Sequence, residues 1–124
     1  MKVNNLDELD LDFIKERLHF FHNWPTKKIL KVEENYRIFL MLESKFGPFR
    51  PNDDVDLFWH EHILCTEKYA NDCNKFFNKF LHHTPTFNIK FLEDMSKKNY
   101  DLMKKEFPNF SEEKILEIIK LGEI

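Results

Sequence analysis

The stretch PNDDVDLFWHEHILCTEKYANDCNKFFNKFLHHTP, residues 51–85, decides the fold that we expect from this sequence. Between its two terminal prolines it carries a helical pattern that is interrupted near Cys65 and Thr66. Asparagine and aspartate at its start can cap a first helix over about residues 52–64, and Thr66 can cap a second over about 66–81. The stretch therefore predicts a central antiparallel helix pair, or one long helix with a jog at the interruption.

Outside this stretch, prolines and the only two glycines, Gly47 and Gly122, fall where a helical pattern ends. The apolar residues on either side repeat at helical spacing, and Ser111 is suited to cap the last helix. The further helices that we expect cover about residues 11–21, 26–46, 89–107 and 111–121. The sequence thus predicts an all-α protein, a single compact bundle of about five to six helices in one domain over residues 1–124.

Composition limits the class of protein. A chain of 124 residues with 42% hydrophobic and 33% charged residues can bury one core without disulfides or a structural metal. The formal net charge of -3 lacks the basic excess of a dedicated nucleic-acid binder. No apolar run suits a membrane span and the N-terminus does not resemble a signal peptide, so we expect a cytoplasmic protein with no membrane association. Cys65 and Cys73 are accordingly expected to be free thiols.

The central stretch also gathers the residues that could carry chemistry. The candidate site residues are His60, His62, His82, His83, Asp56 and Cys73, with Trp59 and Tyr69 as supporting aromatic residues. Residues two apart on a helix point about 200° apart, so His60 and His62 do not share a face. Asp56 and His60, four apart, do share one, and we expect the carboxylate to ligate beside the imidazole or to orient its ring.

If the two central helices are antiparallel, the end of the second lies near the start of the first. His82 or His83 would then approach Asp56 and His60. A mixed set of histidine and aspartate ligands suits a transition metal, zinc or iron. His60 and His83 are the first-choice ligands, His62 or His82 the third, and Cys73 a soft ligand or an adjacent thiol. The spacing is not HExxH, so Glu61 is not expected to be a metalloprotease base, and no catalytic residue is specified.

Two other interpretations stay open. The same residues could form a buried hydrogen-bond network that fixes the helix pair in a non-enzymatic protein-interaction module. Within the metal-binding interpretation, a catalytic site would use an open coordination position of the metal to bind a small-molecule or peptide substrate. Nucleic-acid binding ranks last, because the chain is mildly acidic and has no recognisable stacking motif. The sequence does not specify a protein partner.

The pattern VDxxWHxHIxxTxxYxxxCxxxFxxFxHHxP, which includes Asp56 and His83, resembles the glycine-rich domain-containing protein-like family. This resemblance covers about the central third of the chain and implies a helical fold. That family occurs in plants within larger proteins and in bacteria as small stand-alone chains. The resemblance implies a shared site centred on Asp56, His60, His62, Cys73, His82 and His83, without a settled reaction. With two glycines, the chain lacks the glycine-rich tail of the larger members.

Overall fold

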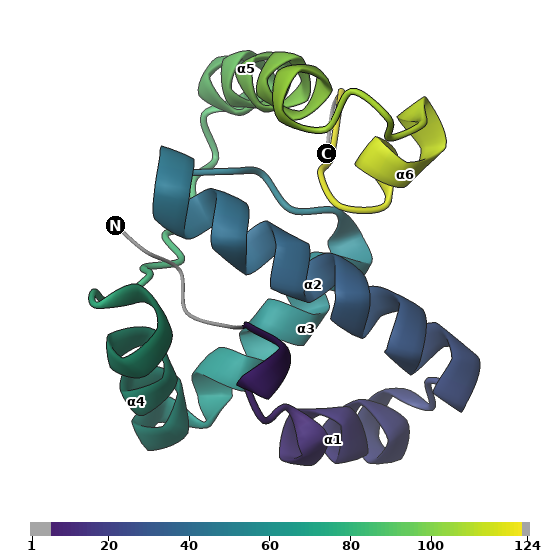
Figure 1. Cartoon of the computed structure of the whole chain (residues 1–124), viewed down its shortest axis with the longest axis vertical. Helices are drawn as coiled ribbons and strands as arrows, with labels where there is room; N and C mark the ends of the chain where they lie inside the picture. The colour runs from purple at the N-terminus through teal and green to yellow at the C-terminus, as the bar shows by residue number, and fades with distance from the viewer. Residues whose placement is uncertain (1–5, 123–124) are drawn as a thin grey trace.

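In the computed structural model, which describes residues 6–122, the chain forms six α-helices and one short 3-10 helix around a shared core (Figure 1). The elements are η1 (Leu6–Glu8), α1 (Asp12–His22), α2 (Thr26–Phe46), α3 (Asp53–Leu64), α4 (Thr66–Phe77), α5 (Ile89–Glu106) and α6 (Glu112–Leu116). The all-α prediction is confirmed, and the expected helix boundaries are met within one or two residues for α1, α2, α3 and α5.

Helix α3 lies at the centre of the fold, in contact with α1, α2 and α4. Its interior face is apolar and aromatic, and Val55, Phe58 and Trp59 are buried. The longest helix, α2, crosses α3 and contributes Tyr36 and Phe39, both fully buried. Because these large side chains interlock, the position of α3 is fixed on three sides. Both tryptophans, Trp24 and Trp59, are buried in this core.

Two details of the central helix pair differ from the sequence prediction. Thr66 is the first residue of α4 rather than its cap; Cys65 occupies the cap position, and its N–H donates to the carbonyl of His62. Helix α4 ends at Phe77 instead of near Leu81, because Asn78 takes a left-handed conformation with φ of 59° and its N–H closes the last turn on Asn74. Asparagine tolerates this conformation better than most residues, so it ends the helix. The residues that follow are consequently free to fold back along α3.

The C-terminal part of the fold is attached through both apolar and polar contacts. Its apolar side chains Met103, Ile115, Ile118 and Ile119 are fully buried in the core. Arg50 is buried, and its guanidinium donates to Ser96 of α5 at 3.0 Å. Asn99 of α5 accepts from the backbone N–H of Arg50 at 2.8 Å. The backbone of Pro51 forms an isolated antiparallel bridge with Ile119, which holds the end of the chain beside the start of α3. No helix within residues 6–122 has the length and apolar character that a bilayer span requires.

Candidate functional site

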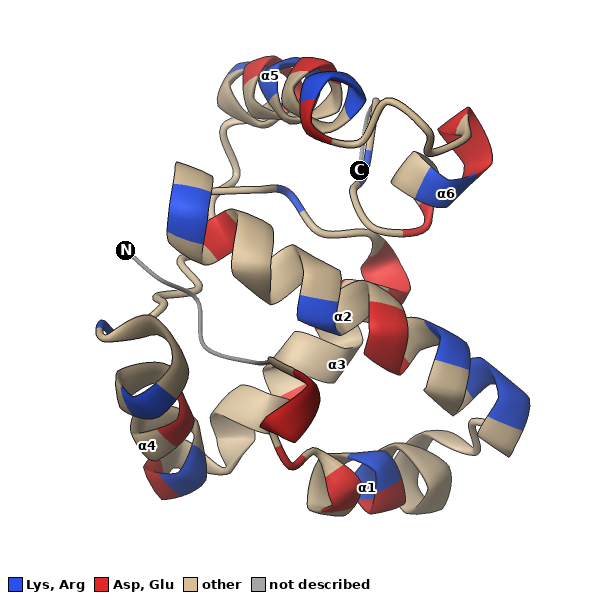
Figure 2. Ribbon diagram, in the orientation of Figure 1, with Lys and Arg blue, Asp and Glu red and all other residues tan. Residues whose placement is uncertain are grey.

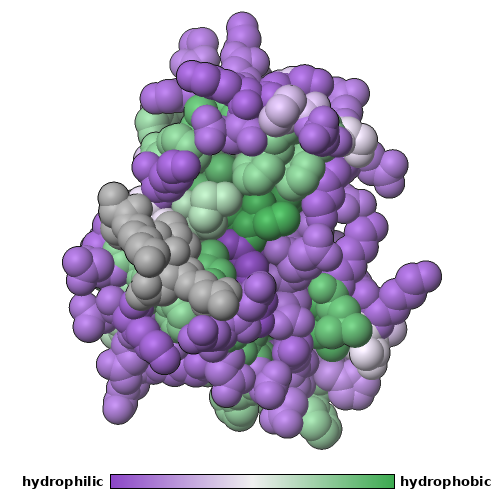
Figure 3. Space-filling model, viewed as in Figure 1, coloured by the Kyte–Doolittle hydropathy of each residue, from purple (hydrophilic) through white to green (hydrophobic). Residues whose placement is uncertain are grey.

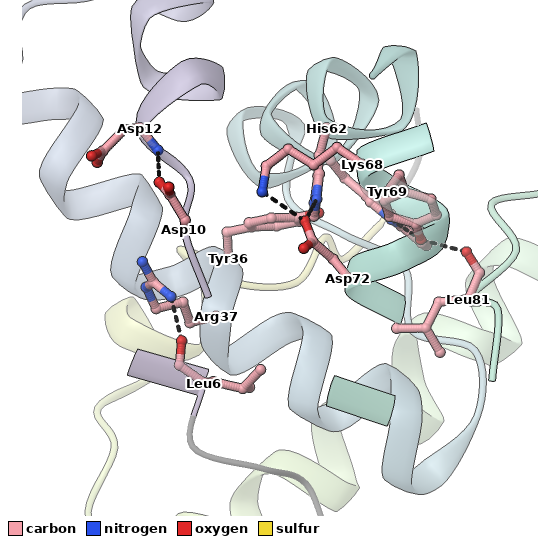
Figure 4. Close-up of polar contacts among 11 residues, drawn as sticks. Leu6, Asp10, Asp12, Tyr36, Arg37, His62, Lys68, Tyr69, Asp72 and Leu81 are labelled. Carbon is pink, nitrogen blue, oxygen red and sulfur yellow. Dashed lines mark hydrogen bonds and ion pairs between the residues drawn. The ribbon is translucent and has the colours of Figure 1, made fainter. Parts of the chain in front are cut away.

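The buried histidine of the stretch, His62, connects three helices through both of its ring nitrogens. Its Nε2 lies 2.8 Å from a carboxylate oxygen of Asp72 on α4, and its Nδ1 lies 2.7 Å from the hydroxyl of Tyr36 on α2 (Figure 4). Lys68 lies 3.0 Å from the same Asp72 oxygen. Since a carboxylate only accepts, Nε2 of His62 carries the proton and donates, and Nδ1 accepts from Tyr36.

The ionisation of this network favours the neutral ring. Burial lowers the pKa of His62, although the hydrogen bond to Asp72 acts in the opposite direction. Burial alone would raise the pKa of Asp72, but the hydrogen bonds from His62 and Lys68 hold it below its ordinary value. Burial raises the pKa of Tyr36 well above its ordinary value, so its hydroxyl remains a donor. The network is therefore fully paired with a neutral imidazole and a charged carboxylate.

A second pair of histidine and aspartate lies closer to the surface. Nε2 of His83, in the chain that follows α4, lies 2.6 Å from Oδ1 of Asp56 on α3. The imidazole stacks on the Trp59 indole, with ring centroids 4.1 Å apart and planes 6° from parallel. The side chain of His83 is 25% exposed and that of Asp56 46% exposed, so solvent reaches the pair. No residue between 6 and 122 forms a hydrogen bond with Nδ1 of His83, which leaves this nitrogen available to a ligand.

Glu43 adds a third ionisable group to this region. The carboxylate of Glu43, on the C-terminal part of α2, accepts from the backbone N–H of Phe49 at 2.9 Å. Burial raises its pKa to about 7, and the electrostatic influence of His83 and Lys79 opposes that rise. At neutral pH the Glu43 carboxyl is thus partly protonated, so it can donate or accept a proton.

The Trp59 ring that stacks on His83 belongs to a buried chain of hydrogen bonds. The indole N–H of Trp59 donates to the Tyr69 hydroxyl at 2.9 Å. That hydroxyl in turn donates to the carbonyl of Leu81 (Figure 4). Burial raises the pKa of Tyr69 far above its ordinary value. Burial also raises the pKa of the Cys73 thiol, so this cysteine favours the neutral form over the thiolate. These contacts fix the Trp59 ring on which His83 rests.

The structure brings together only part of the predicted set. The expected approach of the segment after α4 to Asp56 is confirmed for His83, but the expected pairing of Asp56 with His60 is wrong. His60 is exposed, and within the described residues it has no hydrogen-bond partner, because Asp56 turns toward His83 instead. His82 is also exposed and contacts the Phe80 ring. Among residues 6–122, no three histidine, cysteine, aspartate or glutamate side chains converge as metal ligands would. Both cysteines are free thiols, as expected.

Glu61, between the two histidines of α3, connects α3 to α1. It is buried, and its carboxylate accepts from Arg17 at 2.6 Å and from His22 at 3.2 Å. Burial would raise its pKa, but these two partners hold it below the ordinary value. His22 is thus only partly exposed, whereas His19 is exposed.

Sequence reasoning missed three residues of the region, Tyr36, Glu43 and Asp72. Each nevertheless carries a signal, because each lies on the apolar stripe of its helix. Glu43 follows Phe39 by one helical turn, and Asp72 follows Tyr69 by three residues. An acidic residue on a core-facing stripe needs a partner or a raised pKa, so such positions are worth treating as candidate site residues.

The chain belongs to the UCP032817-like family, an uncharacterised family whose model matches residues 10–118. This match corrects the resemblance drawn from the histidine pattern: nothing in the comparisons indicates the glycine-rich domain-containing protein-like family. No curated protein and no solved structure matches the chain. Any function must therefore be argued from the geometry around Asp56 and His83.

Proposed function

We propose that Asp56, His83 and Glu43 form a general acid–base site for a small polar substrate. The observation that carries the proposal is the 2.6 Å contact between His83 and Asp56, which leaves Nδ1 of a solvent-accessible imidazole without a partner among residues 6–122. A ring whose other nitrogen is held by a carboxylate has a fixed tautomer and orientation, which is what proton transfer requires.

Each group would have a distinct role. Nδ1 of His83 accepts a proton from the substrate, and Asp56 stabilises the imidazolium that forms by accepting from Nε2. Glu43, with a pKa of about 7, supplies a proton to a second atom of the substrate. Environments that give neighbouring groups different ionisation states are the usual arrangement for an acid and a base. Trp59 is the positioning residue that holds the imidazole plane.

The probe for this site is p-nitrophenyl acetate, an activated ester that a reactive imidazole attacks at the carbonyl carbon. Nδ1 forms the new bond, p-nitrophenolate leaves, and water releases acetate from the acylated ring. We expect His83→Gln to lower the rate above background on the order of a hundredfold, while the exposed control His82→Gln retains it. A rate that His83→Gln leaves unchanged would exclude His83 as the reactive group.

The same rate in an Asp56 variant separates a positioned imidazole from an ordinary surface histidine, and the pH dependence of a substrate whose leaving group needs a proton tests Glu43. Asp56→Asn lowers the rate in a folded protein, because the amide does not stabilise the imidazolium as a carboxylate does. Proton donation by Glu43 needs its protonated form, so turnover of a substrate that requires an acid falls as pH rises above about 7. Glu43→Gln removes that limb of the profile.

A bound transition metal, zinc or iron, is a second candidate, and the same pair of residues favours it. Histidines that ligate a metal commonly donate their other ring N–H to a carboxylate, as His83 does to Asp56. In this alternative Nδ1 of His83 is the ligand and Asp56 orients the ring. Elemental analysis of untagged protein with His83→Ala and the exposed control His60→Ala tests it: metal that only His83→Ala loses supports this candidate, and metal that neither loses contradicts it.

A further inference from the structure

Helix α5 presents an apolar face that the rest of the fold leaves uncovered. Of its eighteen residues only Ser96, Asn99 and Met103 are buried, and two of these are polar. Phe91 is 51% exposed and Ile89 50% exposed. In Figure 3 apolar side chains gather on the surface between α5 and α2. Such an uncovered apolar strip marks an interaction surface.

The strip borders a groove of about 220 Å³, which we call the α5 groove. Its apolar lining comes from the end of α2, the loop that follows it, and α5: Phe46, Phe49, Phe91, Met95 and Leu102. Asp94 and Lys98, one helical turn apart, are the charged residues of its rim. The groove is thus apolar in the middle and carries one charge of each sign along its edge.

The charges along α5 identify the partner. Lys90, Asp94, Lys98 and Asp101 follow one another at spacings of four, four and three residues, so they form one stripe in which the sign alternates. Read in reverse, the stripe has the opposite sign at every position. Figure 2 shows that α5 carries both basic residues, in blue, and acidic residues, in red. Two antiparallel copies of the helix therefore complement each other, as a two-fold interface requires.

We propose that the α5 groove binds α5 of a second copy of this chain, forming a symmetric dimer. A two-fold axis level with Ser96 places Asp94 of each copy opposite Lys98 of the other, and Lys90 opposite Asp101. Asp94 also accepts from Lys90 of its own helix at 2.9 Å, and a carboxylate has room for a second ammonium. Phe91 of each copy then enters the groove of the other.

The oligomeric state in solution tests the pairing through charge reversal and its rescue. Light scattering coupled to gel filtration at high micromolar concentration is expected to give twice the monomer mass for the native chain. Asp94→Lys and Lys98→Asp each place like charges opposite one another twice across the axis, and each is expected to weaken the dimer at least about tenfold. The double variant Asp94→Lys/Lys98→Asp restores opposite charges and the dimer. Lys27→Asp, a reversal on the exposed start of α2, is the matched control.

The apolar part of the interface has its own variant. Phe91→Ser is expected to give a monomer, whereas Phe20→Ser, which removes a 78% exposed ring on α1, leaves the dimer intact. Circular dichroism and thermal unfolding show that each variant is folded. A native chain that is monomeric, a dimer that survives the single reversals, or a folded double variant that stays monomeric would each overturn the proposal.

Discussion

Replacing Glu43 by glutamine should stabilise the protein at alkaline pH and have little effect at acidic pH. Glutamine is close in shape to protonated glutamate, and its side-chain oxygen still accepts from the backbone N–H of Phe49. What the substitution removes is the ability to ionise. Since burial raises the pKa of Glu43 to about 7, ionisation in the folded protein is unfavourable.

The magnitude follows from the pKa. Each tenfold change in proton affinity is worth about 1.4 kcal/mol, so raising the pKa from 4.5 to about 7 costs about 3 kcal/mol once the carboxyl is ionised. Because the pKa is higher in the folded protein than in the unfolded chain, the protonated Glu43 contributes its full stability to the fold below about pH 4.5. This contribution is lost as the pH rises through about 7. The half-buried position of the side chain reduces the expected difference to about 2 kcal/mol.

Urea unfolding of the native chain and Glu43→Gln, followed by circular dichroism at pH 5 and pH 8, measures the effect. The two proteins should differ little at pH 5, and the variant should be more stable at pH 8 by about 2 kcal/mol. Taking the difference at each pH cancels the titration of all other groups. Glu16→Gln on the exposed face of α1 is the control and should change little. A variant that is less stable than the native chain at pH 8 would show that the ionised Glu43 carboxylate stabilises the folded protein, contrary to a raised pKa.

Other substitutions test the buried contacts. His62→Ala should lower the free energy of unfolding by about 2–4 kcal/mol, because it leaves Tyr36 and Asp72 without their partner and opens a cavity. The control His60→Ala, at an exposed position, should change it by less than about 0.5 kcal/mol. Urea unfolding of both variants measures the difference. Tyr69→Phe should cost about 1–3 kcal/mol, because the Trp59 indole N–H loses its acceptor, and tryptophan fluorescence follows its unfolding. In a Glu43→Gln background, the free energy of unfolding should fall as the pH drops below about 6.5. The lowered pKa of His62 in the folded protein favours folding only at a pH where the same histidine is neutral in the unfolded chain. A fall of equal size in the His62→Ala variant would contradict this prediction.

The helices could be predicted because their ends are marked in the sequence. Gly47 and Pro25 end or begin helices where the apolar period breaks, and Asn52 caps α3 with its side chain on the N–H of Asp54. The end of α4 could not be predicted from the apolar period, because Phe80 and Leu81 continue that period beyond Phe77. Only the left-handed backbone at Asn78 ends the helix there.

The sequence predicted the approach of His83 to Asp56 within the candidate site, but not the other pairings. Helical spacing allowed Asp56 to face His60, yet a side chain on an exposed turn takes whichever partner the tertiary fold supplies. The fold supplies His83, which Trp59 holds flat by stacking. The partners of His62 lie on the preceding helix α2 and the following helix α4, so the spacing rules within one helix do not relate them. Long-range polar contacts of this kind depend on packing, and sequence periodicity describes only the faces that pack.

In the proposed site, Asp56 holds His83 with its proton on Nε2 and leaves Nδ1 as a base. Long-range proton–nitrogen correlation NMR of ¹⁵N-histidine-labelled protein, in the pH range where the ring is neutral, measures this directly. We expect the resonances of the Nε2–H tautomer for His83, assigned by their loss in His83→Gln, and a mixture of tautomers in Asp56→Asn. A neutral His83 ring that carries its proton on Nδ1, or that exchanges freely between tautomers in the native protein, would exclude this role of Asp56.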